Sequence, residues 1–215
     1  MKPNTVTEIN RFFEEHKKLL SQRDAVARAI ETLTACYKNG GKVLLCGNGG
    51  SSADCDHIAG ELLKSFKLKR RPDAAFAAKA ESLYGANGRA LADNLEQGLP
   101  AVSLTAQTAF MTAFLNDRDA QFLYAQGVTA LGRAGDVLIG ISTSGNAKNV
   151  AQALRTARVK DMATIGLAGN TGGAIKELAD VCILSPEKET YKIQEDHLPV
   201  YHLLCAAVES ELFDE

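Results

Sequence analysis

Apolar side chains recur every three or four residues between Thr5 and Tyr37, with one polar break from Ser21 to Asp24. This spacing is the period of an amphipathic α-helix. The Asn39-Gly40-Gly41 segment that follows is typical of the end of a helix. The pattern therefore predicts two N-terminal helices that end before residue 40.

Beyond this point the pattern changes to short apolar runs, each followed by Gly, Ser or Thr and then by a helical segment. The runs are Lys42 to Cys46, Ala101 to Leu104, Asp136 to Ile141, Met162 to Leu167 and Val181 to Leu184. Runs that are apolar on both faces and separated by helix-length segments are typical of a parallel sheet covered by helices on both sides. The sequence therefore predicts an α/β three-layer sandwich with a five-stranded parallel sheet.

The stretch from Phe66 to Pro100 interrupts this alternation, and we interpret it as a helical insertion. It opens with the basic cluster Lys67, Lys69, Arg70 and Arg71, and continues with an Ala-rich, helix-prone segment. Such a cluster is more often a solvated face than a ligand site, although a role in phosphate binding stays open. Because no repeat or linker is visible, we expect one domain over residues 1–215, with N-terminal helices in 1–39 and the insertion in 66–100.

Composition narrows the class of protein. The 215 residues are 46% hydrophobic, which is enough for a core, and 24 Lys and Arg face 26 Asp and Glu with the signs interspersed, so no surface suited to nucleic acid or an anionic membrane is expected. No segment has the roughly 20 consecutive apolar residues that span a bilayer. The five cysteines include no C-x-x-C pair, as in proteins with reduced thiols. We expect a soluble cytoplasmic protein that binds neither nucleic acid nor membranes.

Two loops that follow predicted strands are rich in glycine and hydroxyl side chains. The first runs from Gly47 to Asp54 and the second from Ser142 to Asn146. Glycines let the backbone approach an anion, N–H groups of the next helical turn point at it, and Ser and Thr hydroxyls add uncharged donors. In open sheets, ligands bind beyond the carboxyl ends of the strands. The two loops therefore predict a site for a phosphate monoester.

Other motifs with similar composition do not fit these loops. In a dinucleotide fingerprint, Ser52 would stand at the third glycine position, and no Walker lysine follows either loop. The segment Gly140 to Ser144 ends in serine where a nucleophile elbow needs glycine. For either loop taken alone, an ordinary tight turn remains the alternative.

His57 and Glu61 stand four residues apart in the helix predicted to begin near Ser52. Their side chains therefore share one helix face and can converge on one metal ion or substrate. Taken alone, such a pair is more often an ordinary hydrogen-bonded or solvent-facing pair. The pair indicates a metal site only if further ligands join it.

A second group of nitrogen and oxygen donors lies late in the chain. Gln194 and His202 stand eight residues apart, and His197 competes with His202 as the partner of Gln194. Four such donors from two helices would suit zinc, which accepts imidazole and carboxylate ligands. Pro199 lies between them, so the helix either begins near Pro199 or is kinked there.

Together these motifs resemble the sugar isomerase (SIS) domain and, within it, the phosphoheptose isomerase family. The resemblance covers nearly the whole chain except the 66–100 insertion. The resemblance rests on the following residues: Gly47 to Asp54 with His57 and Glu61, Asn116-Asp117, Gly135 to Asn146, and Ile193-Gln194-Glu195 with His202.

The resemblance implies an aldose–ketose isomerase that converts sedoheptulose 7-phosphate to D-glycero-D-manno-heptose 7-phosphate through a zinc-assisted cis-enediol. The residues that it implies in phosphosugar binding are Asn48, Gly49, Gly50, Ser51, Ser52, Glu61, Asn116, Asp117, Ser142, Thr143, Ser144 and Gln194. The implied ligands of one zinc ion per subunit are His57, Glu61, Gln194 and His202, and the family spacing selects His202 over His197.

The resemblance also implies that Glu61 and His202 transfer protons. It further implies a homotetramer with shared active sites, which would explain how two helices so distant in the sequence meet. Two positions depart from the family pattern. Ala147 replaces a usual serine, and Ser65 replaces a common arginine, for which Lys64, Lys67 or the basic cluster are possible substitutes.

Two alternatives belong beside this interpretation. The first is a phosphosugar-binding or partner-binding regulator of the DnaA-binding type, which the resemblance implies would lack the glutamate and the final histidine. Because Glu61 and His202 are both present, the enzyme is favoured. The second alternative is an isomerase of another ketose phosphate.

Overall fold

Five parallel strands form the centre of the protein in a computed structural model that describes residues 1–213. The strands are β1 (Val43–Gly47), β2 (Ala101–Ser103), β3 (Val137–Ser142), β4 (Ala163–Ala168) and β5 (Val181–Leu184). They lie in the order β2-β1-β3-β4-β5. Each predicted run thus corresponds to one strand, and the predicted α/β sandwich is confirmed.

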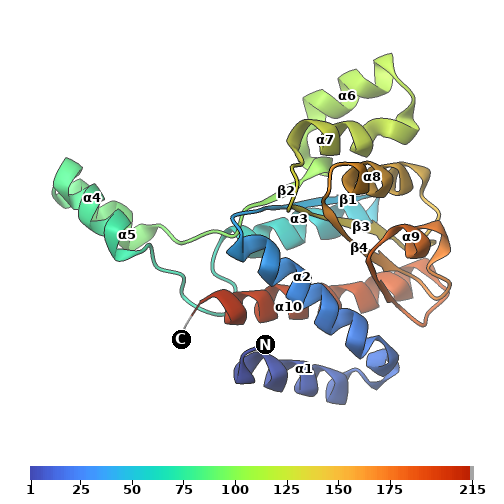
Figure 1. Ribbon diagram of the computed structural model, residues 1–215, viewed down its shortest axis with the longest axis horizontal. Helices are drawn as coiled ribbons and strands as arrows, with labels where there is room; N and C mark the ends of the chain where they lie inside the picture. Colours follow the sequence, from blue (N-terminus) through green and yellow to red (C-terminus); the bar gives the residue numbers. More distant parts are fainter. Residues whose placement is uncertain (214–215) are drawn as a thin grey trace.

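Helices cover both faces of this sheet (Figure 1). They are α1 (Pro3–Glu15), α2 (Arg23–Lys38), α3 (Gly50–Leu63), α4 (Ala74–Tyr84), α5 (Ala86–Asn94), α6 (Thr108–Asp117), α7 (Leu123–Leu131), α8 (Lys148–Val159), α9 (Gly173–Leu178) and α10 (Thr190–Leu212). Helices α2, α3 and α10 pack on one face, and α7, α8 and α9 pack on the other. Helix α1 lies outside the three layers, against α10.

The alternation of side chains along β1 explains why helices must cover both faces of the sheet. Val43 and Leu45 belong to the apolar core beneath α2, α3 and α10, while Leu44 and Cys46 belong to the core beneath α7 and α8. All four side chains are fully buried. Because successive side chains of a strand point to opposite faces, a run that is apolar throughout requires a layer of helices on each side.

The two predicted N-terminal helices are α1 and α2, and a short 3₁₀ turn, Lys17–Gln22, joins them at the polar break. Helix α2 ends at Lys38, just before Gly40, whose positive φ of +73° suits the helix end. Helix α10 begins at Thr190 and continues through Pro199. The alternative that this helix begins near Pro199 is therefore wrong, because nine helical residues precede the proline.

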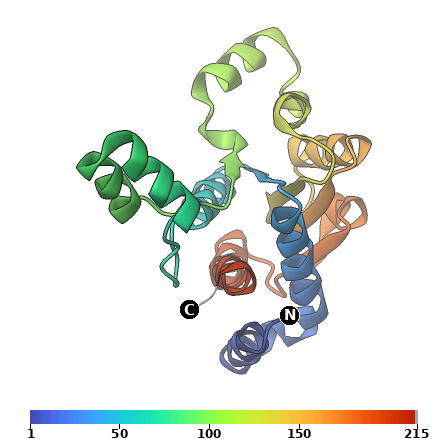
Figure 2. The same cartoon turned by 60° about the vertical axis from the view of Figure 1, so that its left-hand side comes forward.

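The insertion forms a helical hairpin of α4 and α5 that projects from the body on two extended arms (Figures 1 and 2). The two helices pack closely because Gly88 has no side chain, and a Cβ there would overlap the carbonyl of Ala80. Among the described residues, no helix is long and apolar enough to cross a membrane.

Candidate active site

The strand order reverses between β1 and β3, and a cavity lies where these two strands end. The chain leaves β1 toward β2 on one side and reaches β3 on the other, so the loops after β1 and β3 face each other without a helix between them. The cavity has a volume of about 170 Å³, and its lining is Asn48, Ser51, Ile141, Ser142, Thr143, Ser144 and Ala147. The two predicted phosphate loops thus meet in one place.

Two helices begin at residues beside this cavity. Helix α3 begins at Gly50, after Gly49 with its positive φ of +57°, and α8 begins at Lys148, after Ala147. Neither preceding residue makes a side-chain cap hydrogen bond within the described chain. Unsatisfied N–H groups at a helix start carry partial positive charge and favour an anion.

Two lining hydroxyls, on Ser51 and Thr143, make no hydrogen bond with the part of the chain that the structure describes. Ser144, in contrast, accepts a hydrogen bond from the backbone N–H of Asn146 at 3.2 Å. The first two hydroxyls are therefore available as donors to an anion in the cavity. Gly49 and Ser52 belong to the same loop and first helical turn, but neither residue lines this cavity.

A pair of amides braces the cavity, and sequence reasoning missed one of its members. Asn48 and Asn149 exchange two hydrogen bonds of 2.9 Å between their side-chain amides. Tyr124 donates from its hydroxyl to the Gly47 carbonyl at 2.6 Å. These contacts fix the loop after β1 against α8 and α7. No local motif marks Asn149 or Tyr124, since their partners lie far away in the sequence.

His57 and Glu61 lie further along α3, and His202 of α10 lies beside them. His57 Nε2 lies 3.2 Å from a carboxylate oxygen of Glu61, and the rings of His57 and His202 are 5.0 Å apart at 84°. Helices α3 and α10 therefore meet within one chain. Their packing against the same sheet face accounts for this contact without a neighbouring subunit, and the sharing of active sites between subunits stays a prediction.

His202, rather than His197, belongs to this cluster. His197 is buried, and its Nε2 lies 3.3 Å from the carbonyl of Ala168 in β4, so it faces the sheet. His202 lines a cavity of about 400 Å³ beside α1 and contacts the ring of Phe66. Burial, together with the charge of His57, lowers the pKa of His202, which favours a neutral imidazole.

Gln194 contacts Gly50, the first residue of α3. Its amide nitrogen packs against Gly50, where a Cβ would overlap it. Gly50 precedes His57 by seven residues, which correspond to about 10 Å along a helix. Within the described chain, no three His, Cys, Asp or Glu side chains form a ready-made metal cage. The ligand role of Gln194 stays a prediction.

Tyr201 and Asp54 stand behind His57. The Tyr201 hydroxyl lies 2.9 Å from His57 Nδ1 and 3.4 Å from an oxygen of Asp54. Burial raises the pKa of Asp54, although the hydrogen bond from Tyr201 and the charge of His57 oppose that rise. Asp54 ended the predicted phosphate loop but was given no role of its own, and Tyr201 belonged to no predicted motif.

Asn116 and Asp117 end α6, which has no buried residue. The Asn116 amide donates to the Asp117 carboxylate at 2.9 Å. Neither side chain lines the cavity between the loops after β1 and β3. In this conformation the two residues lie outside the cavity. Their contact with substrate stays a prediction.

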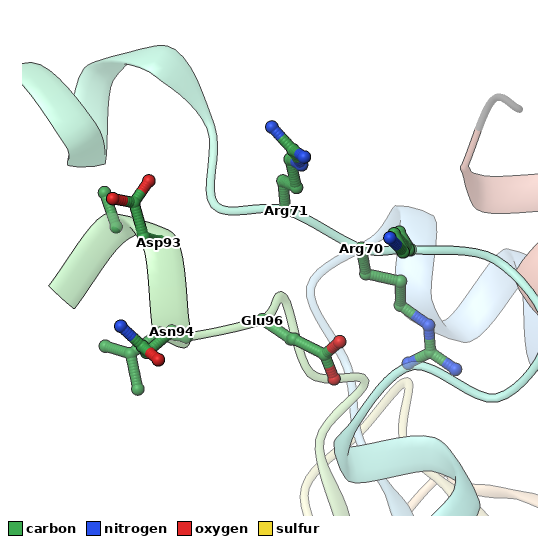
Figure 3. A pocket seen from close by; sticks show the side chains of 8 residues that line it. Arg70, Arg71, Asp93, Asn94 and Glu96 are labelled. Atoms are coloured by element: carbon green, nitrogen blue, oxygen red, sulfur yellow. The ribbon is translucent and has the colours of Figure 1, made fainter. Parts of the chain in front are cut away.

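The basic cluster at the start of the insertion divides into exposed and buried members. Lys67, Lys69 and Arg71 are exposed, whereas Arg70 is buried, and Figure 3 shows Arg70 and Arg71 pointing in opposite directions. Arg70 donates to Glu209 at 2.6 Å and to the Leu62 carbonyl at 2.7 Å. Arg70 therefore cannot replace the family arginine at a phosphate.

Lys64 remains as a basic side chain at the cluster, with its Nζ 3.4 Å from Glu61. Ser65, which stands where the family commonly has arginine, instead holds the base of the insertion. Its hydroxyl accepts the Arg70 backbone N–H at 2.8 Å, and its own N–H donates to Glu96.

Comparison with known proteins agrees with this geometry. Residues 6–97 and 77–169 match the family model described as SIS domain. The phosphoheptose isomerase of Roseiflexus sp. is 37% identical over 201 residues, which cover 94% of this chain and 89% of that protein. Phosphoheptose isomerase 2 of Campylobacter jejuni is 42% identical over 185 residues, which cover 86% of this chain and 79% of that protein.

Two solved structures extend the likeness to the fold. The phosphoheptose isomerase of Neisseria gonorrhoeae is 35% identical with a TM-score of 0.73, and the match covers 95% of each chain. That of Francisella tularensis is 29% identical with a TM-score of 0.74, covering 97% of this chain and 98% of the other. The sheet, the paired loops and the family match define an SIS domain.

Within that class, the chain belongs to the phosphoheptose isomerase family, whose members are aldose–ketose isomerases. The predicted family and the predicted enzyme class are confirmed.

Proposed function

We propose that the protein interconverts sedoheptulose 7-phosphate and D-glycero-D-manno-heptose 7-phosphate through a cis-enediol. The observation that carries this proposal is the course of α3, which begins at the anion cavity with Gly50 and presents His57 and Glu61 further along. The seven residues from Gly50 to His57 correspond to about 10 Å. A phosphate at one end and a carbonyl at the other thus need several carbons between them, which supports a long sugar phosphate.

The chain's own side chains divide the work of isomerisation. N–H groups of α3 and α8, with the hydroxyls of Ser51 and Thr143, hold the phosphate and so orient the sugar. The Glu61 carboxylate takes the proton from one carbon and returns it to the neighbouring carbon. A neutral His202 exchanges protons with the sugar oxygens, and its lowered pKa supports that state near pH 7.

The donor set is chemically suited to zinc. His57 Nε2, the Glu61 carboxylate and His202 lie within one cluster, and zinc accepts two imidazoles and a carboxylate while keeping a position for substrate. Gln194 would have to leave Gly50 to join them. A bound zinc ion would polarise the carbonyl and stabilise negative charge on the sugar oxygens.

We also infer a cytoplasmic homotetramer. All five cysteines are free thiols, and four of them are buried, which fits a reducing compartment. The α4–α5 hairpin exposes Phe76, Leu83, Tyr84 and Leu91, and large apolar side chains gathered on a surface mark association sites. Sedimentation of the purified protein tests the assembly, and a monomer at micromolar concentration would contradict it.

Substitution of Glu61→Gln tests the catalytic assignment. We expect turnover of sedoheptulose 7-phosphate to fall by at least ~10²–10⁴-fold, because a positioned acid–base group contributes on that order. Binding of the sugar phosphate, measured by calorimetry, should persist because the phosphate cavity is untouched. The matched control Glu14→Gln alters an exposed glutamate of α1 and should retain activity.

Substrate comparison separates the alternatives. Turnover of fructose 6-phosphate without turnover of sedoheptulose 7-phosphate would favour an isomerase of another ketose phosphate. Binding of both sugars by the metal-loaded wild-type protein with turnover of neither would favour a regulator. The gathering of Glu61 with His57 and His202 supports the enzyme over that regulator.

A further inference from the structure

Asn149, the second residue of α8, holds the side chain of Asn48. The Nδ2 of Asn48 donates to Asn149 Oδ1, and the Nδ2 of Asn149 donates back to Asn48 Oδ1, both at 2.9 Å. Asn48 lines the cavity at the ends of β1 and β3, whereas Asn149 lies outside its lining. The contact therefore joins a residue of the cavity to a residue behind it, 101 positions further along the chain.

A reciprocal pair of amides has two possible orientations. If both amides turn by 180°, nitrogen and oxygen exchange places in each of them, and the two hydrogen bonds form equally well. The pair alone therefore does not determine whether Asn48 keeps a donor or an acceptor for a further partner. A third contact has to determine it.

The backbone of α8 supplies that contact. The N–H of Val150, a fully buried residue, donates to Asn149 Oδ1 at 3.0 Å. Because a backbone N–H can only donate, turning the Asn149 amide would place its nitrogen against this N–H and leave a buried donor unsatisfied. Tyr124 fits either orientation, since its hydroxyl, 3.2 Å from Asn48 Oδ1, can donate to an oxygen or accept from a nitrogen. Val150 thus fixes the amide of Asn149, and Asn149 fixes that of Asn48.

In this orientation the Asn48 amide keeps one uncommitted N–H. Its oxygen accepts from Asn149 and lies beside Tyr124, one Nδ2 hydrogen goes to Asn149, and the other has no partner in residues 1–213. In the opposite orientation an acceptor oxygen would stand in its place. Because an anion is stabilised by donors, only the first orientation suits a phosphate monoester.

We propose that Asn149 is a positioning residue of the phosphate cavity, which holds the Asn48 amide so that a donor rather than an acceptor is free for the anion. The inference rests on the proposed function in one respect, because the anion is the phosphate group of the sugar. The orientation of Asn48 is a property of the ligand-free chain. A side chain that is already held in place loses less conformational freedom when the ligand binds.

The experiment compares wild type with Asn149→Ala. The heteronuclear NOE of the Asn48 side-chain amide, assigned by its absence in Asn48→Ala, should fall in the ligand-free variant because the amide becomes mobile. The dissociation constant for inorganic phosphate, from NMR titration, and KM for sedoheptulose 7-phosphate should both rise by about 2–10-fold, the usual cost of ordering one side chain on binding. The value of kcat should stay nearly unchanged, because the phosphate is held equally before and during the reaction.

A double-mutant cycle separates this role from a general effect on folding. In the Asn48→Ala background, Asn149→Ala should cause no further loss of phosphate affinity, because Asn149 acts through Asn48. Gln152→Ala is the control one turn further along α8, where the side-chain oxygen accepts from Arg155 at 3.3 Å, and it should change none of these measurements. Asn149→Leu keeps the approximate shape of asparagine without its hydrogen bonds, and provides the same test if Asn149→Ala folds poorly.

The inference is overturned if the Asn48 amide stays ordered in Asn149→Ala, or if it becomes mobile while phosphate affinity remains that of wild type. A loss of affinity of the same size with and without the Asn48 side chain also overturns it, as does the absence of phosphate binding by wild type. Failure of the proposed function is a separate result. In that case wild type would bind inorganic phosphate in a manner sensitive to Asn149, without turnover of sedoheptulose 7-phosphate.

Discussion

The two ends of α3 are built in different ways. At its beginning, the hydroxyls of Ser51 and Thr143 line the cavity between β1 and β3, and the residues that form it lie in or next to the two short loops after these strands. Near its end, His57 and Glu61 depend on side chains from α10 and from the base of the insertion. The first end follows from strand order and loop composition, whereas the second depends on long-range side-chain contacts.

Under the proposed function, this difference would separate phosphate binding from the chemical step along one helix. A phosphate monoester changes little during isomerisation, so fixed backbone donors suit it. The reacting carbons need groups whose protonation and orientation are controlled, and such control comes from neighbours that can be replaced one at a time. Variants at the two ends should therefore fail differently.

The largest effect on stability is expected at the far end, from Glu209→Ala. Glu209 accepts the backbone N–H groups of Phe66, Lys67 and Leu68 and pairs with Arg70, and both side chains of the pair are fully buried. Removing the carboxylate leaves a buried guanidinium without its partner, which costs about 3–5 kcal/mol. Urea denaturation measures the loss.

The exposed pair of Glu81 and Arg89 on the hairpin provides the control, since both side chains are more than half exposed. Glu81→Ala should cost less than about 1 kcal/mol. A similar loss of unfolding free energy in the two variants would show that the buried pair stabilises the protein no more than the exposed pair does.

The same carboxylate predicts a pH dependence. Burial alone would raise the pKa of Glu209, but three backbone N–H groups and Arg70 together lower it below its ordinary value of 4.5. A carboxyl group whose folded pKa is depressed stabilises the protein above the unfolded pKa and loses that contribution as pH falls through the folded value. The free energy of unfolding should drop steeply below about pH 4.5, and Glu209→Gln should flatten that drop.

At the near end, Thr143→Val should weaken binding and leave the chemistry intact. Its hydroxyl is free in the described chain and lines the cavity, and a hydrogen bond to a charged group contributes about 1.5–3 kcal/mol. KM should rise by roughly 10–100-fold with kcat nearly unchanged, because the bond is as strong before the reaction as during it. Steady-state kinetics measure both constants.

Thr129→Val is the control, since that hydroxyl bonds to the Ala125 carbonyl within α7. A fall in kcat at constant KM for Thr143→Val would mean that the cavity takes part in the chemical step. The comparison between the two ends of α3 would then break down.

Local signals explain why the sheet and the first end of α3 could be predicted. Each apolar run became a strand, and the glycine and serine loops mark the ends of β1 and β3 directly. His57 and Glu61 share a helix, so their proximity follows from a spacing of four residues. For these features sequence neighbours are also spatial neighbours.

The groups that surround His57 and Glu61 could not be predicted from local signals, because their contacts join distant segments, and His202 was placed with them only by the family resemblance. Arg70 belongs to a basic cluster whose other members are exposed, and its burial depends on Glu209, 139 residues further along. Tyr201 lies 144 residues after His57 and is one of several aromatic residues without a motif. Only the packing of α10 beside α3 gives these residues their roles.

The smallest effect should come from Ala147→Ser, which restores a hydroxyl where the family usually has one. Ala147 precedes α8 with extended backbone angles, φ −62° and ψ 112°, and makes no side-chain cap in the described chain. A serine there can accept an N–H of the first turn, and such caps contribute about 0.5–2 kcal/mol. We expect the free energy of unfolding to rise by about 1 kcal/mol without ligand, as measured by urea denaturation. Because the same N–H groups would otherwise serve the phosphate, the gain should shrink when inorganic phosphate is added, and an equal gain with phosphate present would show that the cap and the anion do not share donors.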